Sequence, residues 1–202
     1  MKFFLLAVFT FLLWPQVALA QTEIREISIS PFLQELEVAK GSSTASTIDV
    51  TNNSEQGVVL NLSTRDFLPG DRGEPQFVPD DEYNDVTYSL ASWIKLESGD
   101  QVVLQPNETK TIHYSIHPPT NAEQGSHYGA ILFSMSDGAI LSGVGITQSI
   151  GTIIIVSYGE ARSEGYVEFF SKPSVVWWNE KLQFANRFVN TGHVHVKPKG
   201  EV

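Results

Sequence analysis

Short bursts in which apolar residues alternate with polar ones constrain this chain more than any other feature of its sequence. Residues 109–117 alternate in this way, with Thr111, His113, Ser115 and His117 on one side and Ile112, Tyr114 and Ile116 on the other. A period of two places the two sets on opposite sides of an extended strand, as a half-buried strand requires. Since no stretch of useful length has helical periodicity, the sequence predicts an all-β chain.

Similar bursts, separated by turn residues, predict about seven strands over roughly the first 135 residues after position 23. The main ones lie at 24–30, 46–51, 58–63, 88–96, 109–117, 125–135 and 152–156, with short pieces at 36–38 and 101–104. This spacing favours an immunoglobulin-like antiparallel β-sandwich over a parallel α/β fold.

Individual segments carry more specific predictions. Residues 24–30 are expected to form an edge strand because Pro31 limits ladder hydrogen bonding. Residues 125–135 are apolar on both sides, as in a central strand. A short polar loop leads us to expect pairing between 46–51 and 58–63. Residues 66–85 hold three prolines, two glycines and seven carboxylates, a composition that predicts a long loop.

The chain also divides along its length. We expect a signal peptide at 1–20, the sandwich at 21–158, a polar linker at 159–165 and the incomplete start of a second β-sandwich at 166–202. In this last part the predicted strands lie at 166–170, 175–178, 182–190 and 193–197, with Asn190-Thr191-Gly192 as a hairpin turn. So few strands cannot cover their own core, and the sequence is therefore expected to be a fragment of a longer protein.

The first twenty residues have the features of an export signal. Lys2 supplies a positive charge, residues 3–13 form an uncharged apolar run, and Ala18-Leu19-Ala20 is a small-x-small cleavage signature. A retained membrane helix is the weaker alternative, because the apolar run is shorter than the roughly 20 residues that cross a bilayer. Cleavage after Ala20 predicts an exported protein at the cell surface or in the periplasm.

Charge and cysteine content exclude several classes of function. Without Lys2, 12 basic side chains stand against 23 acidic ones, a net charge of −11. This balance opposes binding to nucleic acid or to an anionic membrane face. The chain has no cysteine, which excludes disulfides and thiolate metal sites.

Several residues could in principle hold a metal ion. Acidic residues of the long loop could offer oxygen ligands to calcium: Asp71, Glu74, Asp80, Asp81, Glu82 and Asp85. Their spacing matches no calcium loop, so a solvated acidic loop is the preferred interpretation. Two histidine pairs, His113 with His117 and His193 with His195, are interpreted as exposed strand residues because they lack a clear further ligand. No metal site or cofactor is assigned.

The sequence does not predict an enzyme. It has no G-x-S-x-G elbow, no H-E-x-x-H and no phosphate-binding glycine loop. Trp93 and Trp177-Trp178 could stack on sugar rings, although packing in a core or at a domain junction is the favoured explanation.

The order of landmarks resembles a known family. It runs from SISPFLQELEVAKGSSTASTIDVTNNSEQGVVLNLS through the acidic loop to WIKLESGDQVVLQPNETKTIHYSIHPP and GSHYGAILFS. Over residues 24–158 the chain resembles the bacterial cell-surface family of WxL-interacting proteins. The resemblance implies a peptidoglycan-binding, immunoglobulin-like domain of the wider pilus-chaperone type. It also implies a second sandwich and a C-terminal membrane helix, the latter missing from this sequence.

These observations predict a non-enzymatic binding module of the bacterial envelope. Its partner would be cell-wall glycan or a surface protein, contacted through a strand edge or a sheet face. The alternative is a periplasmic pilus-type chaperone that acts by strand donation. Such a chaperone needs basic residues in its cleft, and only Arg25 and Arg162 stand near the last strand of the sandwich, since residues 143–159 contain no lysine or arginine.

Overall fold

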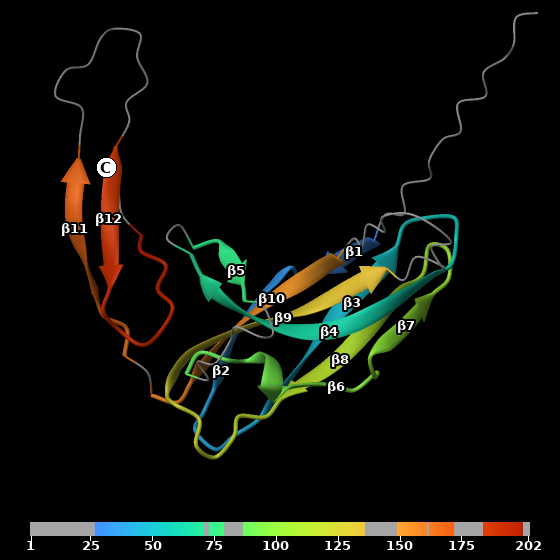
Figure 1. Ribbon diagram of the computed structural model, residues 1–202, viewed down its shortest axis with the longest axis horizontal. Coiled ribbons are helices and arrows are strands. Elements are labelled where there is room, and N and C mark those ends of the chain that lie inside the picture. Colours follow the sequence, from blue (N-terminus) through green and yellow to red (C-terminus); the bar gives the residue numbers. More distant parts are fainter. Residues whose placement is uncertain are drawn as a thin grey trace, which may run out of the picture.

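The computed structural model describes residues 27–70, 73–78, 87–135, 149–160, 162–171 and 184–199. Two β-sheets pack face to face over residues 27–158, and a separate hairpin follows (Figure 1). The smaller sheet is antiparallel and has the order β1 (Ile27–Ser30), β3 (Thr44–Asn52), β8 (Thr109–Ile116) and β6 (Ile94–Leu96). The predicted all-β, immunoglobulin-like sandwich is confirmed.

The larger sheet holds the remaining strands of the sandwich. Its order is β2 (Leu33–Val38), β10 (Ser149–Tyr158), β9 (Gly125–Met135) and β4 (Val58–Pro69), with β5 (Pro75–Phe77) and β7 (Gln101–Leu104) both paired to β4. All pairs are antiparallel except β2 with β10. Several short connections carry the chain from one sheet to the other, among them the cis peptide bond before Pro31 between β1 and β2 and the turn between β6 and β7.

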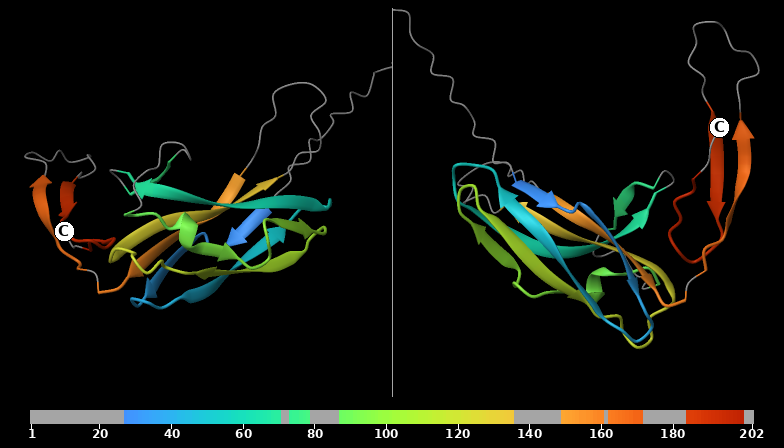
Figure 2. Two further views of the ribbon diagram at one scale, coloured as in Figure 1. Left: turned by 60° about the horizontal axis from the view of Figure 1, so that its bottom comes forward. Right: turned by 180° about the vertical axis from the view of Figure 1, so that it is seen from behind.

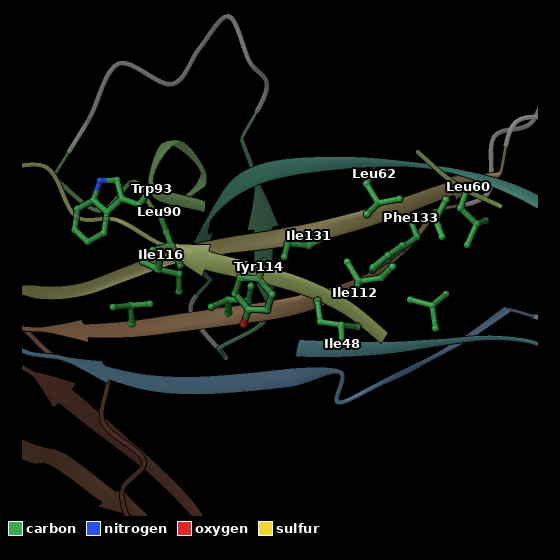
Figure 3. Close-up of a cluster of buried hydrophobic side chains, with 14 of the residues drawn as sticks. Ile48, Leu60, Leu62, Leu90, Trp93, Ile112, Tyr114, Ile116, Ile131 and Phe133 are labelled. Atoms are coloured by element: carbon green, nitrogen blue, oxygen red, sulfur yellow. The ribbon is translucent and has the colours of Figure 1, made fainter. Parts of the chain in front are cut away.

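Alternate residues of both sheets fill one continuous core (Figure 3). Its fully buried side chains are Ile48, Val50, Leu60, Leu90, Leu104, Tyr114, Ile116, Ile131, Ile154 and Val156. Burial of one such side chain contributes about 1.5 to 3 kcal/mol. In a chain without disulfides, this core is the main source of stability.

Two strand predictions are confirmed in their details. β9 lies between β10 and β4, so residues 125–135 do form a central strand. β1 lies at the edge of the smaller sheet, as expected for the segment before Pro31. Residues 24–26 of that predicted strand lie outside the described residues.

The expected pairing of 46–51 with 58–63 is wrong. β3 pairs with β1 and β8, whereas β4 belongs to the larger sheet, so the loop between them crosses from one sheet to the other. Buried Asn52 holds this crossing, because its amide donates to the carbonyls of Gln56 (2.7 Å) and Gln105 (3.0 Å) and its oxygen accepts from Ser54. The length and polarity of a loop therefore do not predict whether the next strand joins the same sheet or the opposite one.

The predicted loop at 66–85 is wrong in its first half. β4 continues to Pro69 and turns into β5, which pairs with it antiparallel, and the rings of Phe67 and Phe77 meet edge to face at 6.1 Å. The predicted strand at 88–96 is also interrupted, by the 3₁₀ turn η1 (Ala91–Trp93). This turn forms because the Asp66 carboxylate accepts hydrogen bonds from the Leu90 and Ala91 amides and the Ser89 hydroxyl.

The last expected strand, 193–197, is wrong as well. β12 (Ala185–Asn190) pairs with β11 (Gly165–Ser171), and the residues after Gly192 leave this hairpin and return to the sandwich (Figure 2). The predicted strand at 175–178 lies outside the described residues, as does the leader at 1–20. Among the residues that the structure describes, no helix is long and apolar enough to cross a membrane.

Candidate binding surface

The outer face of the larger sheet carries an apolar patch of its own. Phe67 of β4, Tyr128 of β9 and Ile155 of β10 form a second buried cluster there, with Leu33 and Ile153 packed against it. An outer sheet face in water would ordinarily be polar, because only the inner face belongs to the core. Side chains from other segments therefore have to cover this patch.

Residues 193–197, which we call the strap, cross this outer face. The strap is fixed to β9 at Ser126, whose amide donates to the His193 carbonyl (2.7 Å) and whose hydroxyl accepts from the His195 amide (2.7 Å). Further along, Lys197 forms an ion pair with Glu35 of β2 at 2.6 Å. The strap thus runs over β9 and reaches β2.

Gly125 is required for this close approach. Its φ angle is +146°, and a Cβ atom there would lie 2.7 Å from the His193 carbonyl oxygen. Any other residue would therefore push the strap away from β9.

Aromatic rings lie at the side of the strap that faces β4. The Tyr128 ring contacts His195, Phe67 and Tyr88, with centroids 6.4, 5.7 and 6.4 Å apart. Burial of Tyr128 raises the pKa of its phenol. The hydrogen bond with Ser126 lowers this pKa by a smaller amount, and the nearby Tyr88 adds a further small increase. Tyr88 remains 41% exposed, so one ring of this group is open to a ligand.

A hollow of about 300 Å³, the tyrosine hollow, opens beside these rings. Its lining consists of Leu68, Pro69, Tyr88, Tyr128, Asn190, Gly192, His193 and Val194. The Asn190 side chain is engaged within the turn, because it donates to the Val194 carbonyl and accepts from the Gly192 amide. The groups that face the hollow are thus mainly aromatic rings, with His193 at the border.

A second hollow of about 670 Å³, the polar hollow, lies on the other side of the strap. Its lining consists of Glu37, Val38, Ala39, Ser157, Gly159, Glu160, Ser163, Val194 and His195. In the described part of the chain, the carboxylates of Glu37 and Glu160 form no ion pair. The hollow therefore offers carboxylate, hydroxyl and imidazole groups to a ligand.

Together the two hollows combine flat aromatic surface with hydrogen-bonding groups. Pockets of several hundred cubic ångströms with a few convergent polar groups are typical of small-ligand sites. Such a site suits a hydroxylated, uncharged ligand that can stack a ring and exchange hydrogen bonds. In the described residues, no group of three or more histidine, aspartate or glutamate side chains could hold a metal ion.

Most residues proposed from the sequence do not contribute to this surface. Trp93 is only 5% exposed and packs in the core between His127 (4.0 Å) and Tyr158 (5.7 Å), so the packing interpretation is confirmed for it. Trp177 and Trp178 lie outside the described residues, as do Arg25, Asp71, Asp80, Asp81, Glu82 and Asp85. Of the seven carboxylates in residues 66–85, the structure describes Asp66 and Glu74, the latter next to β5.

The two histidine pairs have different surroundings. His113 is exposed on β8, and His117, just after β8, bonds to the hydroxyls of Ser43 and Ser115, both at 3.0 Å. His193 and His195 belong to the strap and not to a strand, and they line the two hollows. Arg162 pairs with Glu164, and its carbonyl accepts from the His193 amide, so it helps to anchor the strap.

Sequence reasoning missed Tyr88, Tyr128, Glu37 and Ser157 as surface residues. Tyr128 and Ser157 sit in strands that are apolar overall, and nothing in their local sequence indicates which neighbours they have. Tyr88 was placed in a regular strand. The strap has the alternating residues of a strand, so its sequence predicts pairing with a neighbouring strand and not the bonds to Ser126 on the larger sheet.

Comparison with known proteins gives one family match. The sequence model described as "WxL Interacting Protein, peptidoglycan binding domain" matches residues 32–135. That range includes β2 to β9 and both Tyr88 and Tyr128, while Ser157, Glu160 and the strap follow it. No curated protein matches the chain.

Solved structures of pilus assembly chaperones have a similar fold. The crystal structure of the class 5 fimbriae chaperone CfaA aligns with a TM-score of 0.50 and 11% identity, over 84% of this chain and 68% of that one. A Salmonella enterica SafA pilin complex with the SafB chaperone aligns at 0.44 and 9% identity, over 84% and 85% of the two chains. At such low identity the first likeness shows the fold alone.

Proposed function

Because the chain belongs to the WxL-interacting protein family through its peptidoglycan-binding domain, we propose that it attaches non-covalently to cell-wall glycan through the tyrosine hollow and the polar hollow. The observation that carries this proposal is the exposed ring of Tyr88 next to Tyr128 at the tyrosine hollow, together with the hydroxyls and carboxylates of the polar hollow on the other side of the strap.

The chemistry of the two hollows matches that of a polysaccharide. A sugar ring has one face of C–H groups that packs on an aromatic ring, and its hydroxyl and amide groups need hydrogen-bond partners. Tyr88 and Tyr128 supply the rings, and Glu37, Ser157 and Ser163 supply the partners. A polymer can pass through both hollows because they adjoin the same strap residues, Val194 and its neighbours.

The test is a pull-down of the purified chain on isolated cell-wall polymer. Tyr88→Ala is expected to weaken binding about 5- to 20-fold, because it removes the one ring of the group that is open to a ligand. Tyr166→Ala is the matched control, since this tyrosine of β11 is also exposed (53%) but lines neither hollow. Equal retention of Tyr88→Ala and the unmodified chain would show that the site lies elsewhere.

Export is part of the same proposal. A wall-binding protein has to leave the cytoplasm, and the leader at 1–20 with its cleavage signature after Ala20 supports this. Mass spectrometry of the protein recovered from the envelope is expected to give an N-terminus at Gln21. An intact Met1 in the recovered protein would contradict it.

The chaperone alternative has less support. Its fold is shared, but β10 contains no lysine or arginine, and the nearby Arg162 side chain is paired with Glu164 at 3.0 Å. A chaperone would bind its client's terminal carboxylate with basic residues next to this strand. Among the described residues near β10, Arg162 does not supply such a residue, because its charge is paired with Glu164.

A further inference from the structure

Among the strands that the structure describes, β2 forms the longest open edge of the sandwich. It is the outermost strand of the larger sheet and has six residues. The other edges are shorter: β1 and β7 have four residues each, β5 and β6 have three, a proline follows β1 and another begins β5. Proteins usually protect a long edge by a proline, a lysine or a bulge, and β2 contains none of these.

The backbone of β2 alternates between its neighbour and the free edge. β2 pairs parallel with β10, Leu33 standing opposite Ile153, and the carbonyls of Phe32 and Val38 accept from Ile153 and Gly159. Because every second residue of a strand in a parallel ladder bonds to the same neighbour, the backbone groups of Gln34 and Leu36 also face β10. The backbone groups of the residues between them face away from β10. The N–H and C=O groups of Leu33, Glu35 and Glu37 face outward, and none has a backbone partner in the described part of the chain.

This edge is held rigidly in place. The buried Gln34 side chain accepts hydrogen bonds from the hydroxyls of Tyr114 (2.9 Å) and Ser46 (2.6 Å) and donates to the Thr47 carbonyl (2.9 Å). These bonds tie β2 to β8 and β3 of the opposite sheet. An added strand would meet a preformed edge and would not have to order it, which favours binding.

The side chains of the edge carry negative charge. Glu35 and Glu37 are both exposed on the outer side of β2, and within the described residues Glu35 pairs with Lys197 while Glu37 has no cationic partner. At the start of the edge, Phe32 is 74% exposed and offers apolar surface. Pairing of β2 with a second copy of itself would bring these carboxylates together, and like charges on neighbouring strands are destabilising.

We propose that the β2 edge binds an extended segment of a partner protein that adds one strand to the larger sheet. The segment carries lysine or arginine at alternate positions, which face Glu35 and Glu37, and apolar residues between them. About six residues of this segment pair with β2, over roughly 20 Å. This site shares Glu37 with the polar hollow, but strand addition depends on the backbone edge of β2 and attachment to glycan on Tyr88. Tyr88→Ala and Glu35→Pro therefore distinguish failure of one proposal from failure of the other.

The test uses a ten-residue probe peptide of alternating lysine and valine with the purified chain. Binding is expected to slow amide hydrogen exchange at Leu33, Glu35 and Glu37 at least about tenfold, because these N–H groups become bonded. A peptide of the same charge with two central valines replaced by proline is the control, since proline cannot complete the ladder. Equal protection by both peptides would reduce the contact to nonspecific charge attraction and overturn the proposal.

A matched pair of variants separates the backbone from the charge. Glu35→Pro removes one outward N–H without removing a bond to β10, and it is expected to weaken peptide binding at least about tenfold. Glu35→Gln loses the same charge and the same ion pair to Lys197 but keeps the N–H, and a loss of about threefold or less is expected. Equal losses in the two variants would contradict strand addition.

Two further outcomes are decisive. If Glu35→Pro does not fold, as judged by circular dichroism, the exchange experiment on the unmodified chain decides alone. A concentration-dependent dimer that protects the same three amides without peptide would show that a second copy occupies the edge, and it would overturn the assignment to a basic partner.

Discussion

At the scale of single residues, buried polar side chains determine how the two sheets meet. Gln34 joins β2 to Ser46, Thr47 and Tyr114 of the opposite sheet through three hydrogen bonds. Burial raises the pKa of the Tyr114 phenol to about 12, and the hydrogen bond with Ser46 lowers it by a smaller amount. The neutral phenol is thus the form that the folded chain accommodates.

Tyr114 makes stability depend on alkaline pH. Between pH 10 and about 12 the unfolded chain loses this phenolic proton while the folded chain keeps it. The unfolded state then binds fewer protons, so the free energy of unfolding falls as pH rises. This contribution, about 3 kcal/mol, is fully present below pH 10 and is lost as pH approaches 12.

Urea denaturation at a series of pH values from neutral to alkaline checks this prediction. Tyr114→Phe is expected to flatten the alkaline decline, although it costs about 1 kcal/mol at neutral pH because Gln34 loses a donor. Parallel declines for the variant and the unmodified chain would rule out Tyr114 as the cause.

At the scale of elements, the β4–β5 hairpin and the strap cover the outer face of the larger sheet. Phe77 of β5 packs on Phe67, and His195 of the strap packs on Tyr128. Both segments come from parts of the chain that the sequence interprets otherwise, as a loop and as a strand. Both segments lie against the sheet because their side chains cover the apolar patch of Phe67, Tyr128 and Ile155.

Deletion of residues 69–85 tests the structural role of this hairpin. If the region were only a solvated loop, its removal would leave the melting temperature unchanged. Because the deletion removes β5 and uncovers Phe67, a loss of about 1 to 3 kcal/mol is expected in thermal or urea unfolding. Phe77→Ala, which keeps the chain length, is expected to show part of the same loss.

At the scale of the whole molecule, net charge limits the wall component that the chain can bind. The sequence as a whole has a net charge of −10, so a negatively charged wall polymer is repelled and an uncharged glycan is not. The β2 edge, in contrast, uses this charge to attract a basic segment. The two proposed surfaces therefore select ligands of different charge.

Wall binding is expected to respond to salt in a specific direction. At about 0.05 M salt, wall stripped of anionic polymers should retain the chain more strongly than untreated wall, and the difference should shrink at about 0.5 M because salt screens the repulsion. Pull-downs at the two salt concentrations measure this. Stronger retention on untreated wall at low salt would indicate that an anionic polymer is the ligand.

The pattern of residues along the chain was enough to predict the all-β class and most strands of the sandwich, although not β5 or the interruption at η1. Alternation of residues in β3 and β8 shows which side chains turn inward, because the period of a strand is a local property of the backbone. Apolar residues on both sides of 125–135 predicted a central strand, and β9 is central. Core packing, the favoured explanation for Trp93, is confirmed as well.

Contacts between distant parts of the chain set which segments lie side by side. The separation of β3 from β4, the turn held by Asp66 and the course of the strap over Ser126 all depend on partners distant in the chain. Alternation cannot predict them, since a strand and a strap expose the same pattern of side chains while their backbone groups bond to different neighbours. The candidate binding surface arises from these distant contacts, and for that reason its residues had no local signal.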